Sequence, residues 1–270
     1  MQLLFLLGSF LLAVCIAAFI LPQILLFSYK KKLFDEPDER KVHTQAIPRL
    51  GGVSFFPTIL FSIAFVLGFR YKLGSVIPEA VVEYFVLEGL FIVCGLTFLY
   101  LIGIADDLMG VRYRKKFVVQ IICATFFPLA GLYINNLYGL FGINELPGYL
   151  AYPLTVLVVV FVTNAINLID GIDGLASGLS SISLVILGAL FYHHKLWVYS
   201  MIAFVTFGVL IPFFYYNVFG NINRRHKIFM GDTGSLTLGY IISFLAIKYS
   251  MFNPDVMPYQ HGAIVIAFST

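Results

Sequence analysis

The sequence contains few charged residues and few cysteines. Only 11% of its 270 residues are charged, whereas 60% are hydrophobic and 17% are aromatic. A share of charge this small excludes an ordinary water-soluble domain. The three cysteines, Cys15, Cys94 and Cys123, form no CxxC pair, which argues against a disulfide framework and against a zinc site. The net charge is only +3 and no basic stretch alternates with aromatic residues, so we expect no nucleic-acid partner.

Long apolar segments recur along the whole chain. A helix needs roughly 20 mainly apolar residues to cross the hydrocarbon core of a bilayer. We therefore expect an all-α, polytopic membrane protein with about eight complete transmembrane helices. They are predicted near residues 3–27, 50–69, 81–104, 117–134, 150–169, 175–192, 196–216 and 235–250. A further apolar run begins near residue 261 and predicts a truncated ninth helix.

Lysine and arginine residues are distributed unevenly among the predicted loops. Thirteen of the 17 lie in the loops after the first, third and seventh helices, and four lie elsewhere. Because cytoplasmic loops of membrane proteins carry an excess of Lys and Arg, the odd-numbered loops are predicted to be cytoplasmic. The N-terminus would then lie outside.

Five aspartates are predicted to meet at this cytoplasmic face. They end the third helix, follow the fifth and begin the eighth: Asp106 and Asp107 in GIADDLMG, Asp170 and Asp173 in NAINLIDGIDGLASG, and Asp232 in FMGDTGSL. Asn164 and Asn167 precede Asp170 at three-residue intervals, a spacing that places polar groups on one helix face. Carboxylates beside hydrocarbon are costly without a partner, a metal or water, so the pattern predicts a functional site.

The residue types indicate the chemistry of this site. Oxygen ligands without clustered His or Cys favour Mg²⁺, or Mn²⁺, over zinc. Glycines in IPRLGG, DGIDG and GDTG would let backbone N–H groups approach an anion. The basic residues at 112–116 are suited to a pyrophosphate. Together these features predict phosphoryl transfer, which depends on positioning and charge neutralisation.

Four motifs occur in order between about residues 35 and 250: KVHTQAIPRLGG, ADDLMGVRYRKK, NAINLIDGIDGLASG and FMGDTGSLTLGY. In order and spacing they resemble the polyprenyl-phosphate N-acetylhexosamine-1-phosphate transferases, or glycosyltransferase family 4. The resemblance implies transfer of a sugar-1-phosphate from a UDP-N-acetylhexosamine to undecaprenyl phosphate, with release of UMP. IPRLGG is similar to the bacterial branch that uses UDP-N-acetylglucosamine or a close relative. A bacterial inner-membrane location and a role in cell-envelope polysaccharide synthesis follow from the same resemblance.

The resemblance also implies a role for each matching residue. Asp232 and Asn167 match metal-binding positions. Asp106 and Asp107 match a catalytic pair, one member of which would deprotonate or orient the lipid phosphate. The residues that match substrate-binding positions are Lys116 near the donor pyrophosphate, Asp173 at the uracil, Asp170 and Asn164 beside the donor, and Lys41 at a phosphate.

Residues 1–270 are predicted to form a single integral membrane transferase domain. The family's histidine-rich HxHH loop is not found among the five His residues, so we expect the C-terminal part of the family domain to be missing. Two alternatives stay open: an inactive truncated membrane scaffold, and a cation-coupled transporter, which would place acids near the middle of the bilayer. The aromatic-rich helices are also compatible with a homodimer.

Overall fold

The computed structural model describes residues 2–31, 33, 47–73, 79–221 and 225–251. These residues form α-helices, two short 3₁₀ helices and an isolated bridge between Asn136 and Glu145. The helices are α1 (Gln2–Lys31), η1 (Gly51–Ser54), α2 (Phe55–Lys72), α3 (Glu79–Met109), α4 (Tyr113–Leu129), η2 (Leu140–Gly142), α5 (Gly148–Ile169), α6 (Leu175–His193), α7 (Trp197–Val218) and α8 (Gly231–Ser250). The all-α prediction is confirmed, whereas Lys41 and the predicted ninth helix lie outside the described residues.

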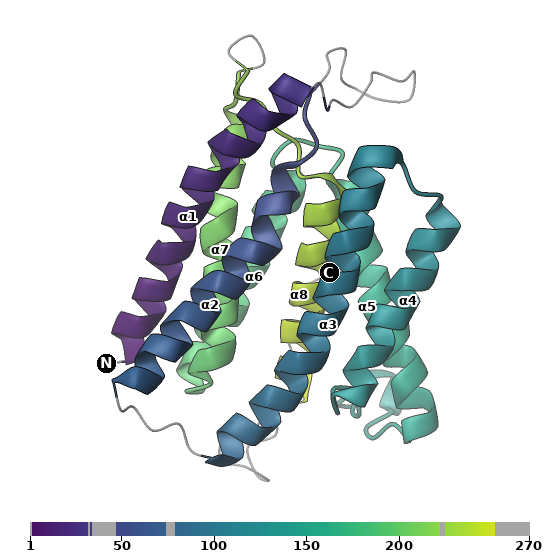
Figure 1. Ribbon diagram of the computed structural model, residues 1–270. Coiled ribbons are helices and arrows are strands. Elements are labelled where there is room, and N and C mark those ends of the chain that lie inside the picture. The colour runs from purple at the N-terminus through teal and green to yellow at the C-terminus, as the bar shows by residue number, and fades with distance from the viewer. Residues whose placement is uncertain (1, 32, 34–46, 74–78, 222–224, 252–270) are drawn as a thin grey trace.

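The helices run alternately up and down, so that every second connection lies at the same end of the bundle (Figure 1). The ends of α1, α3, α5 and α7 and the beginnings of α2, α4, α6 and α8 gather there. We call this the site end, because all the aspartates of the sequence motifs belong to it.

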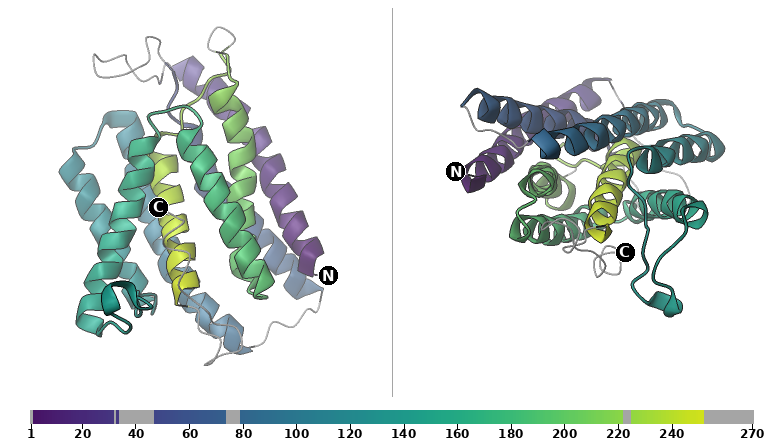
Figure 2. Two further views of the ribbon diagram at one scale, coloured as in Figure 1. Left: turned by 180° about the vertical axis from the view of Figure 1, so that it is seen from behind. Right: turned by 90° about the horizontal axis from the view of Figure 1, so that it is seen from below.

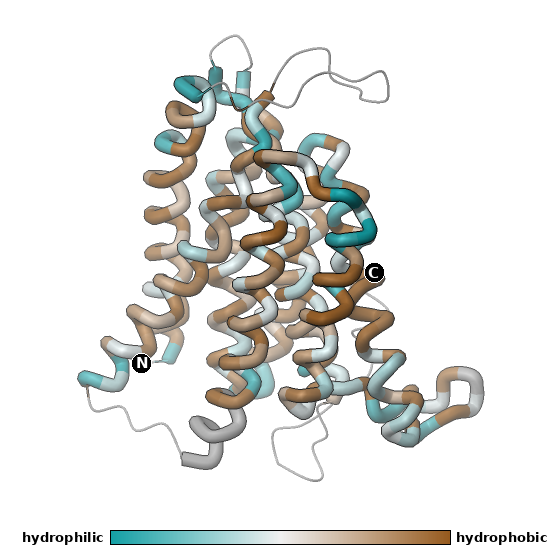
Figure 3. The backbone as a smooth tube through the Cα atoms, turned by 45° about the vertical axis from the view of Figure 1, so that its right-hand side comes forward, coloured by the Kyte–Doolittle hydropathy of each residue, from teal (hydrophilic) through white to brown (hydrophobic). Residues whose placement is uncertain are grey.

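Apolar side chains cover much of the outside of the bundle. On α2, Phe61, Phe65 and Phe69 form a stacked row, and each is more than half exposed. Figure 3 shows hydrophobic residues along the helices and hydrophilic residues mainly towards their ends. Such a surface is suited to lipid rather than to water.

Within the part of the chain that the structure describes, six helices are long and apolar enough to cross a membrane. They are Gln2–Lys31, Gly51–Lys72, Val86–Met109, Gly148–Ile169, Leu175–His193 and Trp197–Val218. Helices also occupy the two other predicted positions, but α4 is only 17 residues long and α8 is rich in Gly, Ser and Thr. A polytopic membrane protein is thus supported, whereas the count of eight spans is not confirmed.

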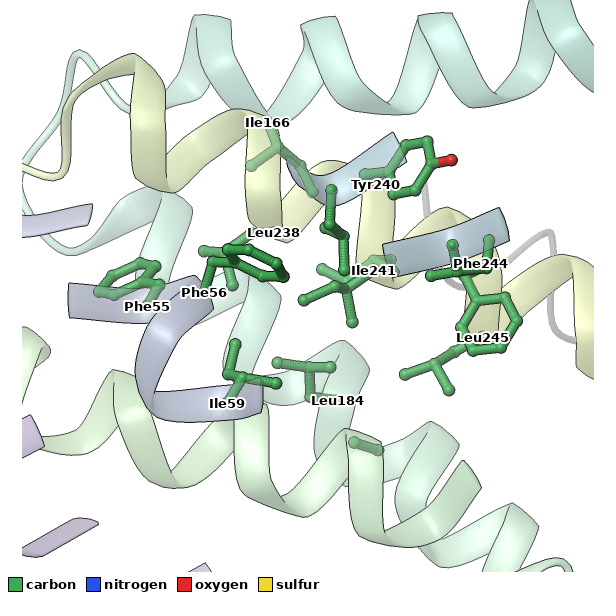
Figure 4. Packing of buried hydrophobic residues seen from close by; sticks show 14 of the residues in the cluster. Phe55, Phe56, Ile59, Ile166, Leu184, Leu238, Tyr240, Ile241, Phe244 and Leu245 are labelled. Atoms are coloured by element: carbon green, nitrogen blue, oxygen red, sulfur yellow. The ribbon is translucent and has the colours of Figure 1, made fainter. Parts of the chain in front are cut away.

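Helix α8 lies inside the bundle, between α3 and α5 in the end-on view (Figure 2). All of its residues except Lys248 are buried. Figure 4 shows Leu238, Ile241 and Phe244 of this helix packed among side chains of α2, α5 and α6. Ser235, Thr237 and Ser243 donate their hydroxyl groups to carbonyls one turn earlier, as Thr237 does to Thr233 at 2.7 Å. Because protein surrounds α8, it does not need the apolar composition that lipid demands.

The residues just before α8 are held against η1 by main-chain contacts. The N–H of Gly51 bonds to the carbonyl of Phe229 at 3.0 Å, and the N–H of Gly52 bonds to that of Met230 at 2.8 Å. A Cβ on Gly52 would lie only 2.1 Å from the backbone nitrogen of Gly234. These glycines therefore permit close packing. Since both N–H groups are already bonded, the expectation that they approach an anion is wrong for Gly51 and Gly52.

Candidate active site

The last turn of α3 points two neighbouring aspartates at different partners. Successive residues on a helix are turned by about 100° from one another. Asp106 faces the beginning of α4, where its Oδ1 accepts a 2.5 Å hydrogen bond from the N–H of Val111. Its Oδ2 lies 3.0 Å from the ammonium of Lys116. Asp107 faces α8 instead.

The carboxylate of Asp107, from α3, caps the N-terminus of α8. Its Oδ1 accepts the N–H of Asp232 at 2.8 Å, and its Oδ2 accepts the N–H and the hydroxyl of Thr233 at 3.0 and 2.6 Å. Gly231 makes this approach possible, because its φ is +73° and a Cβ there would lie 2.6 Å from the carboxylate. A carboxylate at a helix N-terminus satisfies unpaired N–H groups and complements the helix dipole. This geometry gives Asp107 a structural task, and its catalytic role stays a prediction.

Asp232 is the point at which four helices meet. Its Oδ2 contacts the ammonium of Lys116 from α4, which also holds Asp106 of α3. Its Oδ1 accepts a 3.0 Å hydrogen bond from the side-chain amide of Asn167 on α5, which donates to Ser235 at 2.8 Å as well. Residues from three motifs far apart in the sequence thus form one cluster, which we call the Asp232 cluster: Asp106, Lys116, Asn167 and Asp232.

The Asp232 cluster has a donor set that fits magnesium. Two carboxylates, those of Asp106 and Asp232, face the same ammonium group and therefore the same small space. No group of three or more His, Cys, Asp or Glu side chains close enough to hold a metal occurs among the residues that the structure describes. Mg²⁺ usually takes only one or two carboxylates and completes its octahedron with water and phosphate oxygens, so two suffice.

Asp170 ends α5, where it meets the charges of the neighbouring segments. Burial raises the pKa of its carboxyl group well above the ordinary value, and the carboxylates of Asp107 and Asp232 act in the same direction. The guanidinium of Arg49 and the N–H of Gly231 oppose this rise. Asp170 therefore lies close enough to Asp107 and Asp232 for their charges to act on it, and its role at the donor stays a prediction.

The other polar residues of the NAINLIDGIDGLASG motif face elsewhere. Asn164 donates to Gln120 of α4 at 2.5 Å and to the carbonyl of Val160 at 2.8 Å. Asp173 lies in the loop after α5, where its carboxylate pairs with Lys227 at 2.6 Å. Of this motif's four Asn and Asp residues, α5 therefore carries Asn164 and Asn167, with Asp170 as its C-cap, whereas Asp173 lies beyond the helix.

Several residues of the site were not singled out in the sequence. These residues bond to the site's asparagines, carboxylates or loop, or act on them by charge: Ser235, Thr233, Gln120, Arg49, Lys227 and Asn217. Thr233 and Ser235 belong to the GDTGSL motif, so their position beside Asp232 was the available signal. In the sequence, Lys227 is only one of the basic residues of a predicted loop, and Asn217 belongs to none of the motifs.

These features define a helical membrane protein with a carboxylate and lysine site at one end of the bundle. The chain belongs to Glycosyl transferase family 4, whose model matches residues 90–250. It is 33% identical over 240 residues to the "Probable undecaprenyl-phosphate N-acetylglucosaminyl 1-phosphate transferase" of Bacillus subtilis (strain 168), covering 88% of this chain and 62% of that protein. The predicted family is thus confirmed.

Two further relatives carry a similar name. The "Undecaprenyl-phosphate alpha-N-acetylglucosaminyl 1-phosphate transferase" of Salmonella typhi is 30% identical over 240 residues, which are 86% of this chain and 61% of that protein. The protein of that name from Escherichia coli (strain K12) is 28% identical over 245 residues, with the same two shares. The chain therefore spans about three fifths of the length of these relatives.

Proposed function

We propose that this protein transfers N-acetylglucosamine-1-phosphate from UDP-N-acetylglucosamine to undecaprenyl phosphate. The observation that carries the proposal is the convergence of Asp106, Lys116 and Asp232 from three different helices. All three lie within the residues that match the family. The names of the relatives support the transferred group and the acceptor. The products would be UMP and undecaprenyl-diphospho-N-acetylglucosamine, a first membrane step of a cell-envelope polysaccharide.

The reaction needs little acid–base chemistry. An oxygen of the lipid phosphate attacks the β-phosphorus of the donor, and the bond from that phosphorus to the oxygen bridging to the α-phosphate breaks. UMP leaves with this oxygen and its electron pair. A phosphate monoester has a second pKa of about 6 and is largely ionised at pH 7, so the attacking oxygen carries no proton that a strong base must remove.

The Asp232 cluster would bind and orient the reacting phosphates. Asp232, with Asn167, would hold Mg²⁺, for which Mn²⁺ is an alternative. The metal would neutralise charge on the donor diphosphate. Lys116 would bind the pyrophosphate, and Asp106, which holds that ammonium at 3.0 Å, would orient it and the acceptor.

The remaining predicted residues would bind the donor from around this cluster. Asp173 would recognise the uracil and Asp170 would orient the nucleotide. Asn164 would support both by fixing α5 against Gln120 of α4, the contact of 2.5 Å described above. Lys41, which lies outside the described residues, would contact a phosphate.

The site end would face the cytoplasm of a bacterial cell, with the N-terminus outside. Basic residues at this end support the orientation, including Lys30, Lys31, Arg112, Lys115 and Arg225. In this arrangement the apolar chain of the carrier stays in the bilayer, while its phosphate meets the water-soluble donor at the surface.

A UMP-release assay tests the proposal. The purified protein in detergent is supplied with Mg²⁺, undecaprenyl phosphate and UDP-N-acetylglucosamine. We expect UMP only when both substrates and the metal are present, and at least a hundredfold less from Asp232→Asn, as for the loss of one strong charge-stabilising group. Tyr215→Leu, at a position of α7 that is 62% exposed, is the matched control. A folded protein that releases no UMP from this donor or from other UDP-N-acetylhexosamines would instead be an inactive scaffold.

A further inference from the structure

The loop that carries Asp170 and Asp173 is tied to the segment that leads into α8. Asn217, near the end of α7, makes the first connection. Its side-chain oxygen accepts the N–H of Gly174 at 2.7 Å, and its side-chain nitrogen donates to the carbonyl of Ile228 at 3.0 Å. One buried amide, 5% exposed, thus joins the loop to the segment before α8.

An ion pair makes a second connection between the same two segments. Lys227 lies one residue before Ile228, and its ammonium is 2.6 Å from the carboxylate of Asp173. The Lys227 side chain is only 8% exposed, whereas that of Asp173 is 32% exposed. A buried ammonium requires a partner, so Lys227 fixes the direction of the Asp173 carboxylate while leaving part of it accessible.

The packing around Gly174 allows little freedom to this arrangement. Gly174 has a φ of +74°, and a Cβ there would lie 2.7 Å from a methyl group of Val218, the last residue of α7. The end of α7 therefore approaches the loop closely. The tied segment then continues through Met230 and Gly231 into Asp232, so both connections relate the loop to the Asp232 cluster.

We infer that Asn217 and Lys227 are positioning residues, which hold Asp170 and Asp173 at a fixed place relative to Asp232 for binding of the nucleotide sugar. The effect on nucleotide binding rests on the proposed function, whereas the hold on the loop does not. Neither residue touches the Asp232 cluster through its own side chain. We expect them to act by holding the loop and the segment before α8 together.

Hydrogen exchange tests the hold on the loop. The amides of residues 171–175 are compared in the unaltered protein, in Asn217→Leu and in Tyr215→Leu, all in detergent without substrate. Leu has nearly the size of Asn but makes neither hydrogen bond. We expect exchange to become about three to ten times faster in Asn217→Leu, as for the loss of one hydrogen bond, and to be unchanged in Tyr215→Leu. Equal exchange in all three proteins would overturn the inference.

A second variant, Asn217→Asp, keeps the inference testable if Asn217→Leu does not fold. It keeps an acceptor for Gly174 but loses the donor to Ile228. We expect the Gly174 amide to stay protected while the Phe229 and Met230 amides exchange faster. If protection of Gly174 were lost as well, although the rest of the protein exchanged normally, the assignment of this hydrogen bond would be wrong.

Kinetics test the consequence for the reaction. We expect Lys227→Met to raise the KM for UDP-N-acetylglucosamine about tenfold and to change kcat by less than about twofold, because the Asp232 cluster is left intact. Lys227→Arg should recover most of the loss. A fall in kcat at constant KM would contradict a positioning role. If the unaltered protein releases no UMP, the proposed function fails, but the exchange experiment still decides whether these residues hold the loop.

Discussion

Asp106 and Asp107 show how far apart the tasks of two adjacent, chemically identical residues can lie. Asp106 holds the ammonium of Lys116, whereas Asp107 accepts three hydrogen bonds from the first residues of α8. No sequence pattern distinguishes them, because the difference depends on which neighbouring helix each side chain reaches.

Replacement of each aspartate by Asn should separate these tasks. Asp107→Asn removes a charge from the N-terminus of α8 and puts an amide donor opposite Thr233, so we expect a loss of about 1–2 kcal/mol of stability. Asp106→Asn should change stability by less than half of that and lower UMP release by at least tenfold. Thermal unfolding in detergent and the UMP assay measure the two effects. The opposite ranking of the melting temperatures would contradict the structural task of Asp107.

The raised pKa of Asp170 predicts a dependence of stability on pH. Below the ordinary value of about 3.9 the residue is protonated in both the folded and unfolded states. As the pH rises towards the raised value in the folded state, the unfolded chain releases this proton first, so the protein loses stability. Asp170→Asn has no carboxyl group at this position, so its stability does not fall with pH for this reason.

In the absence of divalent cations, the melting temperature of Asp170→Asn should therefore exceed that of the unaltered protein at pH 8 and match it near pH 4. Thermal scans in buffers containing EDTA measure the difference. A difference that does not grow with pH would show that burial of Asp170 carries no such cost.

At the scale of the elements, hydropathy predicted the approximate position of each described α-helix. It did not predict where α4 ends or that α8 is enclosed by other helices. Hydropathy predicts that the fourth helix continues to about residue 134, yet α4 ends at Leu129 and the chain turns at Gly131, whose φ is +76°. The N–H of Ile134 then bonds to the hydroxyl of Thr155 at 2.9 Å. Both a helix and a buried extended segment are apolar, so hydropathy alone does not separate them.

The contact between η1 and α8 predicts that replacement of Gly52, in η1, and of Gly68, in α2, will have opposite effects on stability. A Cβ on Gly52 would collide with the backbone of Gly234, whereas a Cβ on Gly68 in α2 would meet nothing within 4 Å. We expect Gly52→Ala to destabilise the protein by about 1–3 kcal/mol and Gly68→Ala to stabilise it by about 0.5–1 kcal/mol. Melting temperatures of the two variants in the same detergent check this. Equal values would mean that the two segments can separate without cost.

In the whole molecule, α8 is fixed at both ends. Asp107 holds its beginning, and an ion pair holds its last turn, where the half-buried Lys248 lies 2.6 Å from the buried Glu88 of α3. The second oxygen of Glu88 accepts the hydroxyl of Tyr199 on α7 at 2.7 Å. Three helices are thus joined at the end opposite the site.

Removal of one member of this ion pair should cost more than removal of both. Lys248→Met leaves a buried carboxylate without its cation, for which we expect a loss of about 3–5 kcal/mol. The double variant Glu88→Gln, Lys248→Met should recover at least half of it. Thermal unfolding of the four proteins in the cycle gives the coupling. Additive losses would mean that the pair does not stabilise the contact between α3 and α8.

At this scale the sequence predicted the class of fold, the family and the meeting of the motifs at one end. The reason is that topology alone brings the ends of α3 and α5 and the beginning of α8 together. The partners of each residue could not be predicted. Asn217 and Lys227 reach the loop through packing between segments far apart in the chain, which leaves no local pattern.

The composition of α8 also has a consequence for how the protein is made. A helix rich in Gly, Ser and Thr partitions poorly into lipid by itself. Ribosomal synthesis delivers α8 after α3, α5 and α6, the helices that enclose it. The helices that are inserted earlier can therefore pack around α8 when it enters the membrane. The order of the helices along the chain would then also be the order in which they assemble.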